Sequence, residues 1–168
     1  MNAQQNAVSV VCLTGHRNIP FDHMERLPSL IEAHLRELIA RGAREVRAGG
    51  ALGFDTVAAL KVLELKGEFP DLKLTLCLPC RDQTRDWKES WCRAYTYVLE
   101  RADSVHYETD TYTRSCMLDR NRRLVEGSDV CLTYCTHRRG GTYYTCSYAR
   151  ERGVEVINLA KELTEAQK

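Results

Sequence analysis

The sequence predicts an α/β fold: a single Rossmann-like domain with three αβα layers and a mainly parallel sheet, spanning residues 1–168. Short apolar segments alternate about five times with segments of helical periodicity, as in parallel sheets covered by helices on both faces. Glycine-rich or charged segments directly follow four of the predicted strands, at the edge where open parallel sheets bind ligands. We expect a core at 7–160, with tails at 1–6 and 161–168.

The first strand and the first helix follow from the apolar spacing near the N-terminus. Segment 8–13 is short, rich in β-branched valine and followed by Thr14-Gly15, which predicts a short buried strand. Apolar residues at 27–39 recur every three or four positions and predict a helix that ends at a glycine. A capping box of Asp22 with Glu25 could begin this helix, although the proline inside the segment allows a later start.

Two further strand–helix units follow. The short strand 45–48 runs into a glycine-rich turn, and the mostly apolar segment 55–66 predicts a helix packed against the sheet. Segment 72–78 alternates and then becomes apolar, which predicts a third strand. Segment 87–101 places its aromatic and aliphatic residues on one helical face.

The last part of the chain repeats the same pattern. Residues 104–107 predict a weak strand, 115–125 a basic helix and 130–134 a fifth strand. Two glycines open a helix that covers 140–152, and 154–159 is predicted as the last strand before a short polar tail.

The composition argues against several classes of protein. Charged residues make up 28% of the chain and hydrophobic residues 43%, which does not fit a disordered, collagen-like or coiled-coil protein. A net charge of +1 weakens, without excluding, binding to nucleic acid through bulk charge. The chain has no apolar run long enough for a membrane span and no secretory pattern at its start, so we expect a cytoplasmic protein with no membrane partner.

The eight cysteines are expected to be reduced thiols. Cys77 and Cys80 have the spacing of a redox pair, but Cys77 belongs to a strand rather than to a helix start. Cys131 and Cys135, four positions apart, do not form a tidy pair, and a zinc site would need two further ligands. We interpret these cysteines as packing residues and expect neither a metal nor a cofactor.

The turn Gly49-Gly50-Ala51-Leu52-Gly53-Phe54-Asp55 lies between a predicted strand and a predicted helix. Glycines let a ligand approach the backbone closely, and the free N–H groups at a helix start favour a phosphate. The spacing matches neither G-x-G-x-x-G nor a Walker loop. The alternative is a tight turn in which Asp55 caps the helix.

The sequence Gly140-Gly141-Thr142 repeats this arrangement at the last predicted helix. Thr142 could cap the helix or donate a hydrogen bond to a phosphate oxygen. The preceding residues 137–139, His-Arg-Arg, raise the local positive potential, although a solvated basic loop is the alternative.

Two further pairs of residues are candidates for the same edge of the sheet. His16 and Arg17 follow the first strand, where Arg17 could hold a phosphate or carboxylate through two hydrogen bonds and His16 could contact a ribose or base. Arg120 and Asn121 lie in the basic helix, where helical spacing puts some arginines on a solvated face and lets others reach the cleft.

In this order the motifs resemble those of the SLOG superfamily, which joins DprA/Smf, the LOG phosphoribohydrolases and the YpsA-like proteins, and they resemble the YpsA-like branch most. The matching residues are Thr14-Gly15-His16-Arg17, Gly49 to Asp55, Pro79, Gln83, Trp87, Arg120-Asn121, Ser128-Asp129 and Gly140-Gly141-Thr142. The resemblance implies a Rossmann-like fold that binds nucleotides or nucleotide-derived small molecules. It also makes a homodimer or a higher homo-oligomer plausible.

Three hypotheses for function follow. The first is a sensor or sequestering protein for an ADP-ribose-like, NAD-like or signal nucleotide, with its phosphates at the two glycine motifs. His16, Gln83 or Trp87 would contact the sugar or base, although Trp87 could instead pack its own helix. The second is hydrolysis of a nucleotide N-glycosidic bond. The glutamate of the LOG pattern Pro-Gly-Gly-x-Gly-Thr-x-x-Glu is absent here, and Asp55 or Glu108 could replace it. The third is a DprA-like binder of single-stranded nucleic acid.

Overall fold

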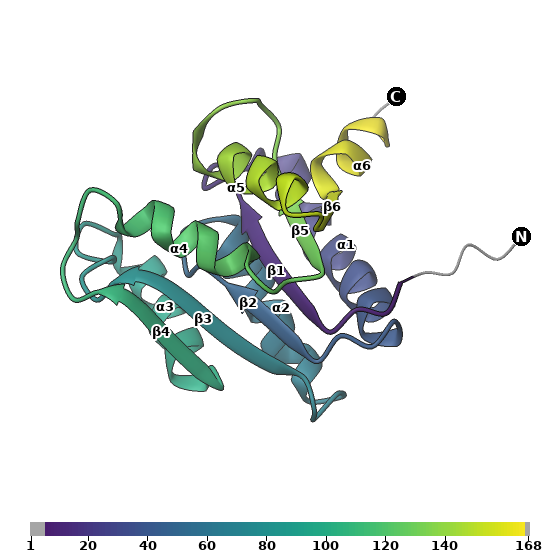
Figure 1. Ribbon diagram of the computed structural model, residues 1–168, viewed down its shortest axis with the longest axis horizontal. Coiled ribbons are helices and arrows are strands. Elements are labelled where there is room, and N and C mark those ends of the chain that lie inside the picture. Colours follow the sequence, from purple (N-terminus) through teal and green to yellow (C-terminus); the bar gives the residue numbers. More distant parts are fainter. Residues whose placement is uncertain (1–5, 167–168) are drawn as a thin grey trace, which may run out of the picture.

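The computed structural model describes residues 6–166, which form a six-stranded sheet between two layers of helices (Figure 1). The strands are β1 (Val10–Gly15), β2 (Glu45–Ala48), β3 (Lys73–Cys80), β4 (Ser104–Thr109), β5 (Val130–Tyr134) and β6 (Glu155–Asn158). The helices are α1 (Phe21–Ala40), α2 (Phe54–Lys66), α3 (Glu89–Arg101), α4 (Cys116–Val125), α5 (Gly140–Glu151) and α6 (Leu159–Glu165). The predicted three-layer, Rossmann-like α/β fold is confirmed.

All neighbouring strands are parallel, in the order β4-β3-β2-β1-β5-β6. From β1 the next three strands are added in order toward one edge of the sheet, and β5 and β6 are added on the other side of β1. Val11 of β1 therefore pairs with Val46 of β2 on one side and with Val130 of β5 on the other. The direction of winding therefore reverses between β1 and β5. The loops that follow these two strands diverge there, which is where open parallel sheets leave room for ligands.

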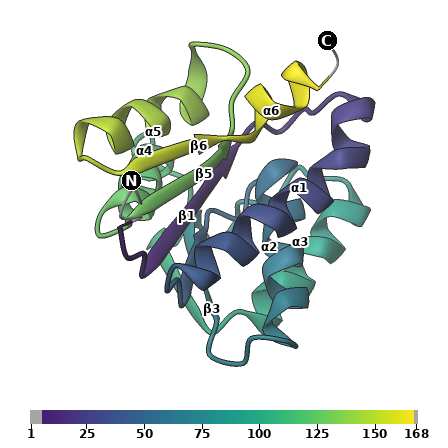
Figure 2. The ribbon, with the colours of Figure 1, turned by 90° about the vertical axis from the view of Figure 1, so that its right-hand side faces the viewer.

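This winding places the helices on both faces of the sheet. The connections from β1 to β4 are right-handed crossovers that put α1, α2 and α3 on one face of the sheet. The connections from β4 to β5 and from β5 to β6 run in the opposite direction and put α4 and α5 on the other face (Figure 2). Helix α6 returns to the first face, where it packs beside α1. In the described part of the chain, no helix has both the length and the apolar character that crossing a membrane requires.

The helix α1 begins earlier than its apolar spacing indicates, and the capping box of Asp22 with Glu25 is not formed. Its N-cap is Pro20, without a side-chain hydrogen bond, and Pro28 lies inside the helix. The reason for the early start is tertiary. His23 is buried, and its Nδ1 lies 2.7 Å from the Tyr134 hydroxyl of β5, so the first turn of α1 packs against the sheet.

The predicted polar tail after the last strand is wrong for 161–165. Strand β6 ends at Asn158, whose side chain accepts a hydrogen bond of 3.1 Å from the backbone N–H of Ala160 and so caps α6. Leu159 and Leu163 of this helix are buried in the same core cluster as α1. Most of the predicted tail at 1–6, and residues 167–168, lie outside the described residues.

Candidate functional site

A cavity of about 340 Å³ lies at the carboxyl ends of β1 and β5, where the winding reverses. The loops after β1, β2 and β5 and one face of α4 form its walls. The sequence-predicted residues that line it are Thr14, Gly15, His16, Arg17, Asp55, Arg120, Asn121, Gly140, Gly141 and Thr142. The loops after β1, β2 and β5 therefore meet beside one face of α4, whereas the predicted segment after β3 does not reach this cavity.

The loops after β1 and β2 are locked together at close range. Gly15 lies directly over Phe54, so that a Cβ at this glycine would come within 2.3 Å of the phenyl ring. Gly53 has a φ of 77° and lies against the backbone of Arg17, where a Cβ would meet the carbonyl oxygen at 2.2 Å. The N–H of Phe54 donates a hydrogen bond of 3.2 Å to the carbonyl of His16. The backbone of this wall is therefore fixed before any ligand arrives.

Asp55 is the buried carboxylate of the cavity. It lies in the first turn of α2, 4% exposed, and its Oδ2 accepts a hydrogen bond of 3.2 Å from the N–H of Ala51. Its Oδ1 is buried and has no hydrogen-bond partner within the described residues. Burial raises the pKa of Asp55 to about 6, although the charge of Arg120 and the Ala51 N–H oppose the rise.

This carboxylate changes the prediction for the glycine-rich turn. We expected Gly49 to Asp55 to hold a phosphate, but the N–H groups of Ala51 and Phe54 already donate to Asp55 and His16. Asp55 itself brings a carboxylate to the first turn of α2, the position that a bound anion would use. Gly49, Gly50 and Gly53 of this turn lie behind the cavity wall rather than on it.

Arg120 is the one arginine of the basic helix that turns inward. It is 5% exposed, its Nε donates a hydrogen bond of 2.8 Å to the Asn121 side chain, and its guanidinium also donates to the carbonyl of Gly49. Burial lowers the pKa of Arg120, and the charge of Asp55 opposes that effect. An arginine remains protonated at neutral pH, so a fixed positive charge faces the buried carboxylate.

The neighbouring arginines of α4 point elsewhere. Arg122 donates a hydrogen bond of 3.0 Å to the Tyr144 hydroxyl, and Arg123 forms an ion pair with Glu108. Glu108 is therefore held on β4, away from the cavity, and cannot replace the missing LOG glutamate.

The start of α5 forms the opposite wall of the cavity. Arg139 is the N-cap without a side-chain hydrogen bond, and Gly140, Gly141 and Thr142 form the first turn. Thr142 lies inside this turn and is not the N-cap, so the predicted capping role of Thr142 is wrong. The first N–H groups of a helix have no acceptor within it. Arg139 also lies on this wall, so this end of the cavity combines free donors with positive charge.

His16 connects the loops after β1 and β5. Its Nε2 accepts a hydrogen bond of 2.9 Å from the N–H of Thr136, and its ring stacks on His137 at 4.1 Å between centroids. Burial, and then the neighbouring His137, lower the pKa of His16. The imidazole is therefore neutral at physiological pH, with its proton on Nδ1.

Besides the three glycines of the turn after β2, the three predicted site residues near the end of β3 also lie outside the cavity. Pro79 is buried at the end of β3, and Gln83 donates a hydrogen bond of 3.4 Å to the carbonyl of Gly50. Trp87 packs edge-on against Tyr95 of α3, at 5.5 Å between ring centroids. The strand order explains this placement: β3 lies between β2 and β4 and is separated from β1, so the loop after β3 contacts the segments after β2 and β4.

Two apolar residues of the cavity wall were missed. Met117 and Leu124 lie on α4 on either side of the inward-facing Arg120 and Asn121. The spacing 117, 120, 121 and 124 is that of one helical face, so periodicity alone could have grouped them.

Comparisons with known proteins identify the family. The model of the YpsA family, described as YspA SLOG family, matches residues 11–156. The chain belongs to the YpsA SLOG family. Its relatives include two UPF0398 proteins, from Bacillus cereus (strain B4264) and Bacillus thuringiensis (strain Al Hakam). Each is 28% identical to this chain over 162 residues. Each match covers 87% of this chain and 85% of the relative.

Two solved structures of DNA processing protein A (DprA) share the fold of this YpsA family member. The Streptococcus pneumoniae protein gives a TM-score of 0.64 at 19% identity over 89% of this chain, which spans about half (49%) of that protein. The Helicobacter pylori protein, described for its single-stranded DNA binding mode, gives a TM-score of 0.61 at 20% identity over 96% of this chain and 74% of its own. These similarities establish the fold of the SLOG domain.

Proposed function

We propose that the protein binds a nucleotide, or a small molecule derived from one, in the cavity between β1 and β5 and acts as a sensor or sequestering protein. The observation that carries the proposal is the pairing of two unlike ends in one cavity. One end has the first turn of α5 with Arg139, and the other has the buried carboxylate of Asp55, while Arg17 lies on the wall beside the start of α2. A phosphorylated sugar presents the complementary pair, an anion and hydroxyl donors.

The phosphate is assigned to the start of α5 rather than to the start of α2. Both helix starts present positive dipole ends, but Asp55 already brings a negative charge to that of α2. At α5, Gly141 has space around it: a Cβ there would meet its nearest neighbour, the Asn121 amide, at 3.7 Å. Arg17 lines the same cavity with an exposed side chain, and its guanidinium would hold a phosphate oxygen through charge-assisted hydrogen bonds.

The sugar is assigned to the Asp55 end of the cavity. The Oδ1 atom of Asp55 accepts no hydrogen bond within residues 6–166, and a ribose hydroxyl would supply the donor that it needs. A volume of about 340 Å³ is at the small end of ligand pockets, which span roughly 300–1,000 Å³. The cavity therefore fits one nucleoside monophosphate unit, and a larger nucleotide would extend beyond it.

The test is a thermal-shift and calorimetric screen of the reduced protein against nucleoside mono- and diphosphates, cyclic nucleotides, NAD and ADP-ribose. A ligand at a hundred times its Kd adds about 2.7 kcal/mol, which raises the melting temperature by roughly 5–10 °C. Gly141→Asp should abolish the rise, because it puts a carboxylate where the phosphate binds while remaining favourable at a helix start. Gly141→Asn, of the same shape but uncharged, should retain most of it.

A second pair of variants distinguishes a direct effect of Arg17 on nucleotide affinity from a general effect of positive charge. Arg17→Ala should weaken binding by roughly 10- to 100-fold, since a hydrogen bond to a charged group contributes about 1.5–3 kcal/mol. Arg152→Ala removes an equal charge at the far end of α5 and should leave the affinity unchanged. If no nucleotide binds but single-stranded DNA does, with an affinity that falls steeply with salt, the proposal is wrong and a DprA-like role replaces it.

Hydrolysis of an N-glycosidic bond is a second candidate, favoured by Asp55 alone. A buried carboxyl with a pKa near 6 can hold a proton for a leaving base or take one from water. Incubation with the bound nucleotide, followed by chromatography, would reveal free base. Asp55→Asn should then abolish turnover while binding persists. Recovery of the nucleotide intact from the wild-type protein would reject this candidate and leave the binding proposal standing.

A further inference from the structure

A second and larger cavity, of about 800 Å³, lies on the other side of the loop between β5 and α5. It is bounded by α5 and α6, and two cysteines, Cys135 and Cys146, open onto it together with Arg150 and Lys161. The proposed nucleotide site does not use these thiols. His137 is the residue that both cavities share, so the loop 135–142 forms a wall between them.

The two thiols belong to a connected group of sulfur atoms. Cys12 and Cys131 are paired in register on β1 and β5, and both are fully buried. The side chain of Cys146 in α5 interacts with those of Cys131 and Cys135, and its Sγ donates a hydrogen bond of 3.4 Å to the Thr133 hydroxyl. Cys135 is half-buried, and its Sγ donates a hydrogen bond of 3.3 Å to the carbonyl of His137.

The surroundings give the two thiols different reactivities. Interactions with the side chains of Cys131 and Thr133, together with the positive charge of Arg150, lower the pKa of Cys146 despite its burial. Burial raises the pKa of Cys135. Cys146 is therefore suited to act as the attacking thiolate and Cys135 as the thiol that resolves the product. Within residues 6–166 no three His, Cys, Asp or Glu side chains are placed to hold a metal ion.

We propose that Cys135 and Cys146 are an oxidisable pair that forms a disulfide when hydrogen peroxide enters the cavity between α5 and α6. The Cys146 thiolate attacks one peroxide oxygen, so that an S–O bond forms, the O–O bond breaks and hydroxide leaves to take up a proton. The Cys135 sulfur then attacks the sulfenic sulfur, the S–S bond forms, and the second oxygen leaves as water. The two thiols lose two electrons, and the peroxide is reduced to two molecules of water.

The choice of this pair rests on access and contact together. Cys12 and Cys131 are also neighbours, but neither opens onto the cavity, and both have no exposed surface. Cys77 and Cys80 are buried against α4, and burial raises the pKa of each thiol to about 11. Cys146 is the thiol that both contacts another cysteine and opens onto the cavity beside its partner.

The disulfide would act on the wall between the two cavities. Its formation takes the Cys135 sulfur away from the carbonyl of His137, and the next residue, Thr136, donates its N–H to His16. A shift of this short segment therefore reaches the proposed nucleotide site. This consequence depends on the proposed function, whereas formation of the disulfide does not.

The experiment measures the disulfide directly. The reduced, full-length protein is treated with hydrogen peroxide, blocked with N-ethylmaleimide and digested with trypsin. Arginines 138 and 139 separate the peptide that carries Cys135 from the one that carries Cys146, so the expected product is a linked pair of peptides, lighter by two hydrogens and released by dithiothreitol. The first peptide also contains Cys131, and fragmentation between positions 131 and 135 assigns the link.

Variants make the result decisive. Cys135→Ser should abolish the link and leave Cys146 open to further oxidation, and it changes only a half-buried residue, so the fold should persist. Cys92→Ser, on α3 and away from the cavity, should leave the link unchanged. A link that maps to Cys131, a link that survives Cys135→Ser, or full alkylation of both thiols after peroxide would overturn the proposal. Each of these results stands whether or not the protein binds a nucleotide.

Discussion

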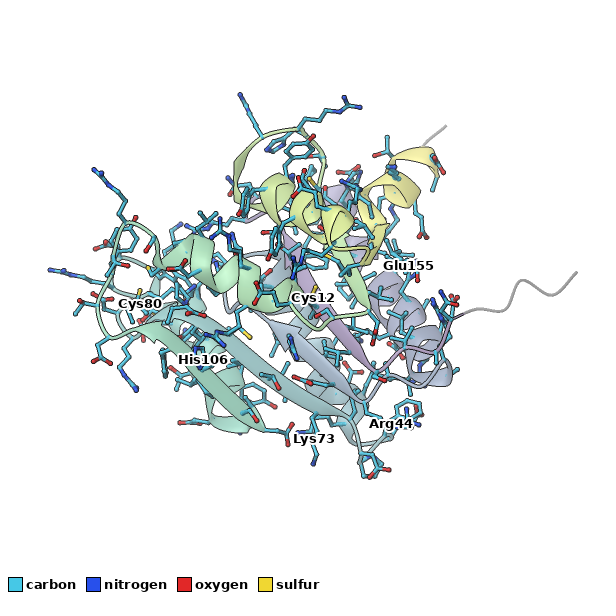
Figure 3. All side chains as sticks on the ribbon, viewed as in Figure 1. Cys12, Arg44, Lys73, Cys80, His106 and Glu155 are labelled. Carbon is cyan, nitrogen blue, oxygen red and sulfur yellow. The ribbon has the colours of Figure 1, made fainter. Side chains whose placement is uncertain are left out.

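The two faces of the sheet are covered in different ways. On one face, α1, α2, α3 and α6 bury a large aliphatic cluster that includes Leu13, Ile31, Phe54 and Leu132. On the other, α4 and α5 cover a small cluster built largely from thiols and short side chains, such as Cys12. Figure 3 looks onto this second face, with Cys12 and His106 labelled, and shows polar side chains over the part of the sheet that α4 leaves open.

Because of this difference, most residues that stabilise the fold lie on one face of the sheet, and most candidate functional residues lie on the other. The aliphatic face supplies most of the buried apolar surface, which is the main favourable contribution to folding. The second face carries the inward-turned Arg120, the start of α5 and the connected thiols. Phe54 joins the two, because it belongs to the aliphatic cluster and also supports Gly15 under the cavity. Variants can show whether this division holds.

The largest effect is expected on the aliphatic face. Phe54→Ala removes a fully buried ring and should lower the free energy of unfolding by about 3–5 kcal/mol. Phe21→Ala removes the same ring where it is 77% exposed and should change stability by less than about 0.5 kcal/mol. Urea unfolding monitored by circular dichroism measures both. Similar losses in the two variants would contradict the assignment of stability to this face.

Asp55→Asn is expected to act in the opposite direction. Asp55 has a pKa near 6 in the folded protein against 3.8 when unperturbed, so the folded state holds a proton that the unfolded state has lost between these values. Stability from this group therefore falls as the pH rises from about 4 to about 6 and stays lower above that. The shift corresponds to about 3 kcal/mol, which sets the upper limit of the stabilisation by Asp55→Asn at pH 8.

The pH dependence is the control for this variant. Near pH 4 the carboxyl is protonated in the folded state, and the wild-type protein and Asp55→Asn should be almost equally stable. Unfolding curves at pH 4, 6 and 8 measure the difference. A constant difference at all three values would show that the substitution acts through packing rather than through the charge.

A smaller effect is expected where the two faces meet. Gly15→Ala forces the Phe54 ring to move and should cost about 1–3 kcal/mol through overpacking. The same substitution combined with Phe54→Leu should cost less than the sum of the two single changes, because the shorter side chain leaves space for the new methyl group. A double-mutant cycle by urea unfolding gives the coupling, and strict additivity would mean that the contact is relieved in another way.

The smallest effect is expected on the second face. Cys12→Ala removes one buried sulfur atom and should cost about 1 kcal/mol, as for the loss of one buried methylene group. Leu13→Ala, at the next position of β1 but on the aliphatic face, should cost about 2–5 kcal/mol. If thermal or urea unfolding gave equal costs, the two faces would contribute alike and the division would fail.

The sequence predicted the alternating strands and helices of a parallel sheet better than it predicted where each element begins and ends. The bounds predicted for two strands, 45–48 and 130–134, are those observed for β2 and β5. The start of α1 and the whole of α6 depend on tertiary contacts, of His23 with Tyr134 and of Leu163 with the core. Local periodicity does not contain these contacts, so both were missed.

The same limit applies to the candidate site. Position after a strand correctly indicated which loops lie at the ligand edge, but only the strand order decides which of these loops meet. Gln83 and Trp87 follow β3 and lie away from the cavity for that reason. The inward turn of Arg120, in contrast to Arg122, depends on the rotation of α4 about its axis. Three arginines within one short helix cannot reveal that rotation.

The position of β1 at the centre of the winding has a consequence for how the protein is made. His16 and Thr136 contact each other across 120 positions of the chain, so the cavity cannot close until β5 and α5 have left the ribosome. Pairing of such distant segments into a parallel sheet is slow compared with local folding. The early strands and helices can assemble during synthesis, whereas the candidate site is completed only when the last segments dock against the first strand.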